Sequence, residues 1–304
     1  MTTLLLSGLA VTAAVCASLT AAVIPLLRRA RVVDVPGDRS LHRTPVPRGG
    51  GLAIVLAASL ATWTAVLAAV HLQGAVHAMS GVDVALMGLA TVLAFALLGL
   101  IEDLFSVSVR ARLVLQLVLG AGLGLVAHSA FEVSLWWTPA ICVGTAALVN
   151  ATNFMDGANG LACGHALLTS LWYVQVAAVA PVAGLGLVMV SVAGACLGFL
   201  PFNTPRAKVF LGDSGSYALG SAWAFAVTAC LAQGVAVEAA LAPVLVLLAD
   251  TGYTLWKRLR AGQCWYEPHR LHVYQRLVCA GWPHWASALL VTLAAASCCA
   301  LAAG

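Results

Sequence analysis

The 304-residue sequence contains few charged residues. Only 9% of its residues are Asp, Glu, Lys or Arg, compared with about 25% in a soluble domain, and 62% are hydrophobic. This composition excludes a water-soluble fold and an intrinsically disordered chain. The 15 Lys and Arg residues exceed the 11 Asp and Glu residues by too little for a nucleic-acid-binding protein. The remaining class is a polytopic helical protein in a lipid bilayer.

The sequence also lacks a cysteine motif and a basic start. None of the nine cysteines forms a C-x-x-C pair or a Cys/His metal spacing, so we expect them to be packing thiols. The first residues carry no positive charge, and Arg28, Arg29 and Arg31 follow the first apolar run instead. This order predicts a retained first span with its N-terminus outside.

Ten apolar runs are long enough to cross a membrane at roughly 20 residues per span. They lie near residues 2–27, 51–72, 84–101, 112–129, 133–150, 161–180, 182–201, 215–234, 238–256 and 284–303. We therefore predict an all-α polytopic membrane protein with about ten transmembrane helices and catalytic cytoplasmic loops. Residues 1–304 then form a single integral membrane domain, with both termini on the same face.

The charged residues divide between the two faces of this arrangement. All fifteen Lys and Arg residues fall in connections on one face, which the positive-inside rule makes cytoplasmic. Eight of the eleven acids share that face, and acids at membrane depth are costly and usually functional. The basic surplus there predicts a site for an anionic substrate beside the bilayer.

Two cytoplasmic segments are basic. Residues 34–51 hold Arg39, His42 and Arg48 before three glycines, and residues 256–277 hold Arg270, His272 and Arg276. Arginine forks suit phosphate oxygens, and glycines let backbone N–H groups approach an anion at a helix N-terminus. The alternatives are a positive-inside anchor for the first segment and a basic amphipathic segment on anionic lipid for the second.

The other three segments carry acids and amides. Glu102 and Asp103 are adjacent acids, so a cation should offset their repulsion, either the following arginines Arg110 and Arg112 or a metal. Residues 150–161 hold one carboxylate and three amides, more than a simple turn needs. Asp213 stands between glycines, where a carboxylate can bind Mg²⁺ or cap a helix.

These five segments, in this order, resemble the polyprenyl-phosphate N-acetylhexosamine-1-phosphate transferases of the glycosyltransferase family 4 type. Residues 150–161 are similar to the family's Asn-rich Asp-Gly motif, and residues 210–216 to its Phe-x-Gly-Asp-x-Gly-Ser motif. Glu102-Asp103 is similar to its acidic pair, which is usually Asp-Asp. Residues 34–51 and 269–276 are most similar to the branch that initiates O-antigen or capsule chains.

The resemblance implies a Mg²⁺-dependent phosphoglycosyltransferase, with Mn²⁺ as the alternative ion. Such an enzyme transfers a sugar 1-phosphate from a UDP-sugar to undecaprenyl phosphate and releases UMP, starting a lipid-linked glycan. The sugar is an N-acetylhexosamine or a 6-deoxy-N-acetylhexosamine. The resemblance also implies a multi-pass protein of the bacterial inner membrane, an active site facing the cytoplasm, and a homodimer.

Residue roles follow from the same resemblance. Asp213 is expected to hold the metal, together with Asp156. Asp103 is expected to orient or deprotonate the lipid phosphate, with Glu102 in support. The expected substrate-binding residues are Asn150, Asn153, Arg39, His42, Arg48, Arg270, His272 and Arg276.

Two other functions stay open at this point. An ion-coupled secondary transporter could use Asp103, Asp156, Asp213 and Asp250, although transporters place such acids near the membrane midplane and show repeats. Within the family, the alternative is a phospho-N-acetylmuramoyl-pentapeptide translocase. No long loop in this sequence suggests a peptide-bearing substrate, which ranks the translocase lower.

Overall fold

The computed structural model describes residues 2–36, 41–42, 44–73, 75–180, 182, 184–264, 266–267 and 269–304. Arg39, one of the predicted phosphate contacts, lies outside these ranges. The long helices are α1 (Thr2–Arg29), α2 (Gly51–Gln73), α3 (Ala75–Phe105), α4 (Val109–Phe131), α5 (Thr138–Met155), α6 (Leu161–Val179), α7 (Leu185–Asn203), α8 (Gly212–Ala232), α9 (Val237–Arg260) and α11 (His284–Ala302). Shorter elements are β1 (Val33–Asp34), β2 (Val46–Pro47), the 3₁₀ helix η1 (Leu135–Trp137) and α10 (Val273–Cys279).

The predicted all-α membrane fold is confirmed. Within the described ranges, nine helices are long and apolar enough to cross a membrane, and α5 is the long helix that does not meet this criterion. Its 18 residues include Asn150 and Asn153 near the C-terminal end, which lower its hydropathy. α5 nevertheless packs along α4 and α8, and it corresponds to the fifth of the ten predicted spans.

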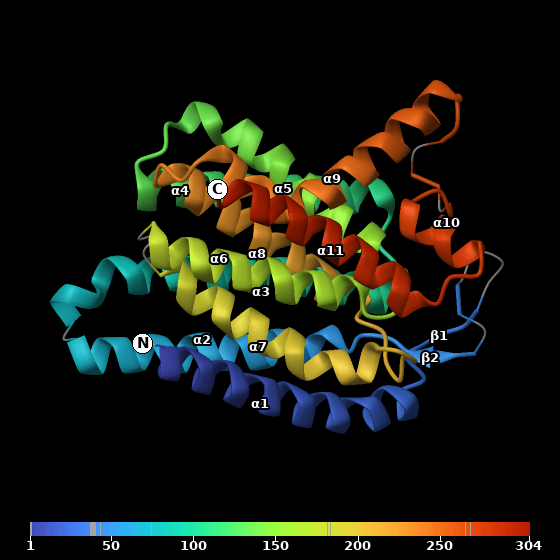
Figure 1. The fold of residues 1–304 in the computed structure, drawn as a ribbon, viewed down its shortest axis with the longest axis horizontal. Helices are drawn as coiled ribbons and strands as arrows, with labels where there is room; N and C mark the ends of the chain where they lie inside the picture. The colour runs from blue at the N-terminus through green and yellow to red at the C-terminus, as the bar shows by residue number, and fades with distance from the viewer. Residues whose placement is uncertain are drawn as a thin grey trace.

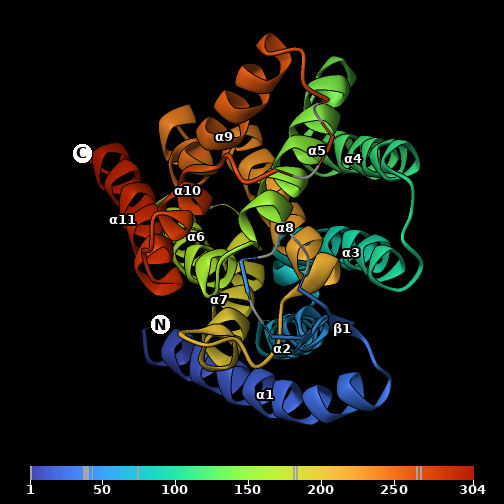
Figure 2. The same ribbon diagram turned by 90° about the vertical axis from the view of Figure 1, so that its right-hand side faces the viewer.

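α8 is the central helix of the bundle, and Figure 2 shows it surrounded by the others. Nearly all of its residues are buried, including the large side chains of Tyr217, Trp223 and Phe225. Its small residues allow neighbouring backbones to approach closely, as is typical of helix contacts in membranes. At Gly220, for example, an added Cβ would lie 2.6 Å from Cα of Val149 in α5.

The connections with predicted chemistry gather at one end of the bundle, where Figure 1 shows β1, β2 and α10. Both chain termini lie toward the opposite end in the same view. α9 extends beyond the other helices at the site end, and the chain returns from it through α10 to α11. The five segments singled out in the sequence are therefore neighbours in space, as the alternation of spans predicted.

Close helix contact predicts a stability effect at Gly198 of α7. An added Cβ there would lie 2.1 Å from the backbone oxygen of Ala13 in α1, so Gly198→Ala should force the two helices apart. Such overpacking costs about 1–3 kcal/mol of unfolding free energy. Gly122→Ala on α4 is the control, because no atom lies within 4 Å of its added Cβ and alanine favours helix by up to about 1 kcal/mol. Thermal unfolding in detergent should separate the two variants; equal midpoints would contradict the packing account.

Candidate active site

Backbone pairing attaches the first connection to the segment before α8. Phe210 donates its N–H to the carbonyl of Pro47 at 2.8 Å, and the N–H of Gly50 returns to the carbonyl of Phe210 at 2.9 Å. The N–H of Gly51 donates to the carbonyl of Leu211 at 2.7 Å. The prediction that these glycines offer N–H groups to an anion is therefore wrong for Gly50 and Gly51. Their small size instead lets the two segments pack closely, because an added Cβ on Gly51 would lie 2.3 Å from Cα of Gly215.

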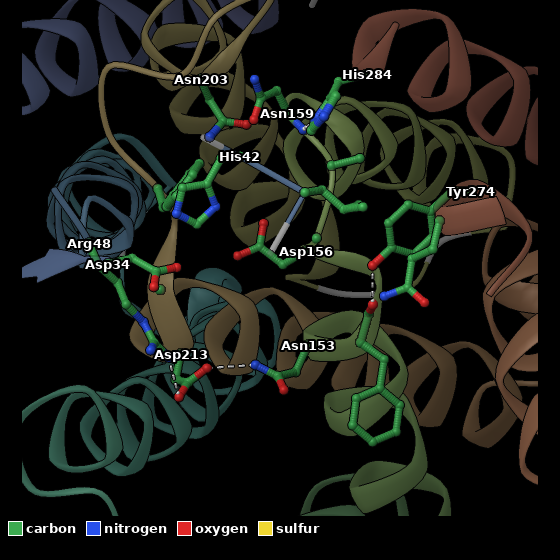
Figure 3. A pocket seen from close by; sticks show the side chains of 17 residues that line it. Asp34, His42, Arg48, Asn153, Asp156, Asn159, Asn203, Asp213, Tyr274 and His284 are labelled. Carbon is green, nitrogen blue, oxygen red and sulfur yellow. Dashed lines mark hydrogen bonds and ion pairs between the residues drawn. The ribbon is translucent and has the colours of Figure 1, made fainter. Parts of the chain in front are cut away.

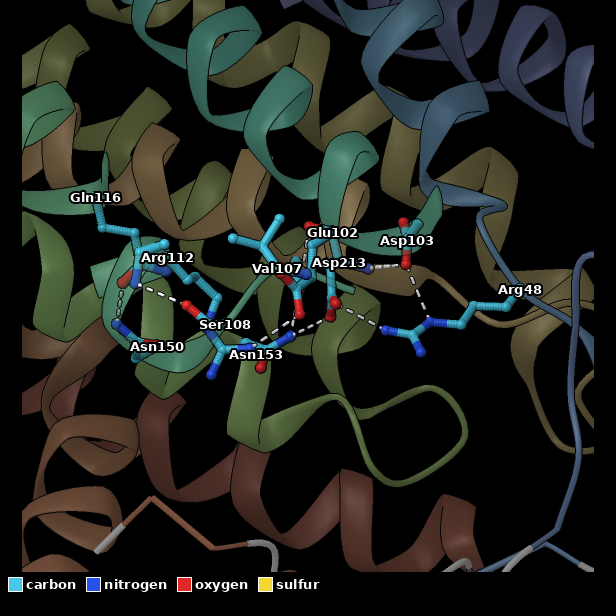
Figure 4. A network of polar contacts seen from close by, with 12 residues as sticks. Arg48, Glu102, Asp103, Val107, Ser108, Arg112, Gln116, Asn150, Asn153 and Asp213 are labelled. Atoms are coloured by element: carbon cyan, nitrogen blue, oxygen red, sulfur yellow. Dashed lines mark hydrogen bonds and ion pairs between the residues drawn. The ribbon is translucent and has the colours of Figure 1, made fainter. Parts of the chain in front are cut away.

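This pairing places Arg48 between two carboxylates. Its Nε lies 3.0 Å from Oδ1 of Asp103, and its Nη2 lies 2.7 Å from Oδ2 of Asp213 (Figure 4). Asn153 donates its side-chain N–H to the other oxygen of Asp213 at 2.7 Å and to the hydroxyl of Ser216 at 3.0 Å. Burial lowers the pKa of Arg48, but the charges of Asp213 and Asp103 outweigh it and raise that pKa overall.

The two adjacent acids of α3 point to different partners. Asp103 accepts from the backbone N–H groups of Asp213 and Ser214, both at 2.9 Å. Glu102 instead accepts from the N–H of Val107 at 3.1 Å and lies 3.4 Å from Nη1 of Arg112. The predicted offset by a following arginine is thus confirmed for Glu102. The partner of Asp103 is Arg48, which no local pattern indicated.

A polar cavity of about 310 Å³ opens beside Arg48 and Asp213. Figure 3 shows Asp156 projecting into it, between Asp213 on one side and His42 and Asn203 on the other. No hydrogen bond joins the carboxylate of Asp156 to another described residue. Burial raises the pKa of Asp156 well above its ordinary value, the charge of Asp213 raises it further, and Arg48 only partly opposes this. The cavity therefore favours an added cation or a proton beside Asp156.

The oxygen donors of this cavity fit a hard divalent cation. Asp156 and Asp213 line the same space, and Asn153 adds an amide oxygen nearby. Among the described residues, no group of three or more His, Cys, Asp and Glu side chains could hold a metal by itself. Mg²⁺ commonly uses one or two protein carboxylates and completes its shell with water and substrate phosphate. The two carboxylates therefore suit Mg²⁺ in the presence of a phosphate-bearing substrate, and suit Zn²⁺ poorly.

A second, larger cavity of about 700 Å³ lies between α4, α5 and α9. Its walls are largely apolar, with Leu113, Leu117, Val143, Leu248 and Leu255 among them. Asn153, Phe154 and Gln275 line both cavities, so the polar and the apolar space meet at the end of α5.

Several predicted residues border the apolar cavity rather than the polar one. His272 lines it, and its Nδ1 lies 2.7 Å from Oδ2 of Asp250. The other carboxylate oxygen of Asp250, Oδ1, accepts from the N–H of Val273 at 3.0 Å. This pairing explains how Asp250 can be held within α9. Asn150 also lines the apolar cavity and donates to Oε1 of Gln116.

The structure brings together some of the predicted residues and leaves others apart. Arg48, His42, Asn153, Asp156 and Asp213 line the polar cavity. Arg270 and Arg276 line neither cavity, and Arg276 is exposed. Their role in binding the phosphates of the substrate stays a prediction.

Other lining residues were missed as candidates in the sequence. They are Asp34, Asn203, Phe210, Tyr274, Gln275 and His284, whereas Asn159 is one of the three amides already noted in residues 150–161. Asn203 and His284 stand at the ends of apolar helices, where a polar residue on the charged face was an available signal. Tyr274 is buried and donates to the carbonyl of Phe154 at 2.7 Å, so it fixes the position of the α5 end.

Comparison with known proteins identifies the family to which this chain is related. Residues 85–232 match the model of "Glycosyl transferase family 4". A decaprenyl-phosphate N-acetylglucosaminephosphotransferase of Mycobacterium leprae is 31% identical over 88% of this chain and 75% of the relative. A probable undecaprenyl-phosphate N-acetylglucosaminyl 1-phosphate transferase of Bacillus subtilis is 27% identical over 89% and 77%. A phospho-N-acetylmuramoyl-pentapeptide-transferase of Desulforudis audaxviator is 33% identical over 65% and 68%.

The ion pairs of Arg48 predict a stability loss in Arg48→Ala, because two buried carboxylates would lose their cation. Removing one partner of a fully buried pair costs 3–5 kcal/mol, and we expect roughly 2 kcal/mol because the Arg48 side chain is 38% exposed. Arg206→Ala removes an exposed arginine and should change unfolding by less than about 0.5 kcal/mol. Thermal midpoints in detergent measure the difference; similar values for both variants would show that the pairs do not stabilise the fold.

Proposed function

The chain belongs to glycosyl transferase family 4, and we propose that it transfers a sugar 1-phosphate from a UDP-sugar to undecaprenyl phosphate, with release of UMP. Membership already makes it a membrane-embedded polyprenyl-phosphate sugar-phosphate transferase. One observation carries the finer proposal: a polar cavity with paired carboxylates and an arginine meets an apolar cavity at Asn153 and Phe154. These two spaces suit a nucleotide-sugar and a lipid, respectively.

The donor diphosphate belongs in the polar cavity. Arg48 supplies a guanidinium that its two carboxylate partners hold in place, and guanidinium groups bind phosphate oxygens well. His42 adds an imidazole whose buried Nε2 has no partner among the described residues. Asn153 orients Asp213 through its amide N–H.

Asp213 and Asp156 would hold Mg²⁺ or Mn²⁺. When bound there, the ion would neutralise charge on the donor diphosphate. We assign the ion to these two residues because their carboxylates line one cavity and the charge of Asp213 disfavours a second anion at Asp156.

The reaction needs positioning more than proton transfer. An oxygen of undecaprenyl phosphate attacks the β-phosphorus of the UDP-sugar and forms a new P–O bond. The bond between the β-phosphorus and the bridging oxygen breaks, and that oxygen leaves with UMP. A phosphate monoester is largely ionised near neutral pH, so the residues of this site act mainly by holding and neutralising two anions in line.

The acceptor belongs in the apolar cavity. Its polyprenyl chain would lie between α4, α5 and α9, with its phosphate directed toward Asn153. His272 borders this space, and its pairing with Asp250 directs Nδ1 away from a ligand, leaving Nε2 as the atom for a phosphate contact.

Several finer features of the proposal rest on the sequence. Segregation of the basic residues supports an active site at the cytoplasmic face of a bacterial inner membrane, with both termini outside. The resemblance of residues 34–51 and 269–276 supports an N-acetylhexosamine or 6-deoxy-N-acetylhexosamine donor and an O-antigen or capsule pathway. A homodimer rests on the resemblance alone.

The two alternatives have unequal support. A transporter would need several acids free to bind its coupling ion, but both oxygens of Asp103 are engaged by Arg48 and the start of α8, and Asp250 pairs with His272. The pentapeptide-transferase alternative is decided by the donor, because such an enzyme would use a peptide-bearing UDP-sugar and ignore a plain N-acetylhexosamine.

Asp213→Asn should lower turnover by at least about 100-fold, because the amide removes the charge that holds the cation. Purified protein is given undecaprenyl phosphate and a panel of UDP-N-acetylhexosamines, one of them peptide-bearing, and UMP release is measured with Mg²⁺ or with EDTA. Asp83→Asn makes the same chemical change at an exposed site of α3 and should retain activity. Near-normal turnover by Asp213→Asn would remove it as the metal ligand, and release without the lipid would contradict the transferase.

A bulky side chain in the apolar cavity should weaken acceptor binding alone. Ala147 lines that cavity and is exposed, so Ala147→Trp should raise KM for undecaprenyl phosphate about tenfold and leave KM for the UDP-sugar unchanged. Ala140→Trp places the same side chain at an exposed position of α5 that lines neither cavity. Equal changes in both Michaelis constants would argue against a separate acceptor site.

A further inference from the structure

Asp103 is buried at the junction of α3 and α8, and every oxygen it has is in use. Its side chain is 2% exposed. Oδ1 accepts from the N–H of Asp213 and lies 3.0 Å from Nε of Arg48, while Oδ2 accepts from the N–H of Ser214. Asp103 lines neither the polar nor the apolar cavity. A ligand in either space would therefore not meet its carboxylate.

The backbone around Asp103 is shaped for this contact. Gly99, one turn earlier in α3, lies so close to α8 that an added Cβ would be 2.2 Å from the backbone oxygen of Asp213. Gly212 adopts φ +77°, a left-handed conformation that favours glycine, and turns the chain into α8. An added Cβ on Gly212 would lie 2.9 Å from Oδ2 of Asp103. The two glycines thus allow α3 to present a carboxylate to the start of α8.

The start of α8 has no cap of its own. Leu211 occupies the N-cap position and provides no side-chain hydrogen bond. The first N–H groups of a helix lack partners within the helix, and a carboxylate there also interacts favourably with the helix dipole. Asp103 on α3 therefore accepts the backbone hydrogen bonds that the side chain of a local N-cap residue usually accepts.

We propose that Asp103 is a positioning residue: it caps α8 from α3 and shares Arg48 with Asp213, which fixes the Asp213 carboxylate toward the polar cavity. This role rests on the proposed function, in which Asp213 holds the metal. A positioning role differs from the role that the family resemblance implied for Asp103, a base for the lipid phosphate. A base needs an oxygen that reaches the substrate.

Glu102 provides a matched comparison. It is the neighbouring acid on the same helix, its side chain is 12% exposed, and it contacts Arg112 and Val107 instead of α8. Glu102→Gln and Asp103→Asn each replace one carboxylate by an amide. Two backbone N–H groups and Arg48 donate to the carboxylate of Asp103 and need three acceptor positions. Asp103→Asn replaces one of its two acceptor oxygens by an NH₂ donor, whereas Glu102→Gln leaves these three contacts unchanged.

The first measurement is the affinity for Mn²⁺ alone, determined by electron paramagnetic resonance of free Mn²⁺ without substrate. We expect Asp103→Asn to weaken binding at least tenfold and Glu102→Gln to stay within about twofold of the unsubstituted protein. Equal weakening by both variants would reduce the effect to loss of nearby negative charge and would overturn the proposal.

The second measurement is hydrogen exchange at the start of α8, which needs neither metal nor turnover. Asp103→Asn should speed exchange of the Asp213 and Ser214 amides at least tenfold, whereas Glu102→Gln should not. Unchanged exchange of these amides in Asp103→Asn would show that Asp103 does not cap α8. Faster exchange with unchanged Mn²⁺ affinity would reduce Asp103 to a structural residue. If the unsubstituted protein binds no Mn²⁺, the metal site of the proposed function fails, and exchange still decides whether Asp103 caps α8.

The third measurement is the pH profile of kcat for the residual activity of Asp103→Asn. A positioning role lowers kcat at every pH and keeps the shape of the acidic limb. Loss of that limb, with Mn²⁺ affinity intact, would identify Asp103 as a base and overturn the proposal.

Discussion

The ion pairs of Arg48 with Asp103 and Asp213 are the interaction on which the site depends. They join the first connection, the end of α3 and the start of α8, and Arg48 and Asp213 are 165 positions apart in the chain. Buried carboxylates this close would repel each other without the guanidinium between them. The contact also needs backbones in close approach, which Gly51 and Gly99 allow because they have no Cβ.

With that junction fixed, the chemistry follows from two cavities of opposite character. One cavity is polar, and the negative charge of its carboxylates exceeds the positive charge of Arg48. It therefore suits a cation and the phosphates that accompany it. The other is apolar and opens between membrane helices, so it suits a lipid chain. Asn153 touches both spaces and hydrogen-bonds to Asp213. In the proposed reaction, a water-soluble donor and a membrane-bound acceptor would therefore meet at the end of one helix, α5.

Sequence motifs located the site better than they assigned its contacts. Asp156, Asp213 and Asn153 were expected together and line one cavity. Adjacent acids, however, were treated as a pair, although neighbouring residues on a helix point about 100° apart. Glu102 and Asp103 therefore face different partners. Likewise, a run of glycines before a helix has the same sequence whether its N–H groups bind an anion or its backbone packs against another segment.

The sequence by itself determined the class of protein, the approximate spans and the gathering of five polar segments at one end. Each of these follows from local properties: the length of apolar runs and the alternation of helices across a bilayer. Only the tertiary structure decided that Arg48 rather than a nearby arginine neutralises Asp103, and that the α8 cap comes from α3. Those choices depend on how closely distant backbones approach, and hydropathy and charge along the chain carry no record of that distance.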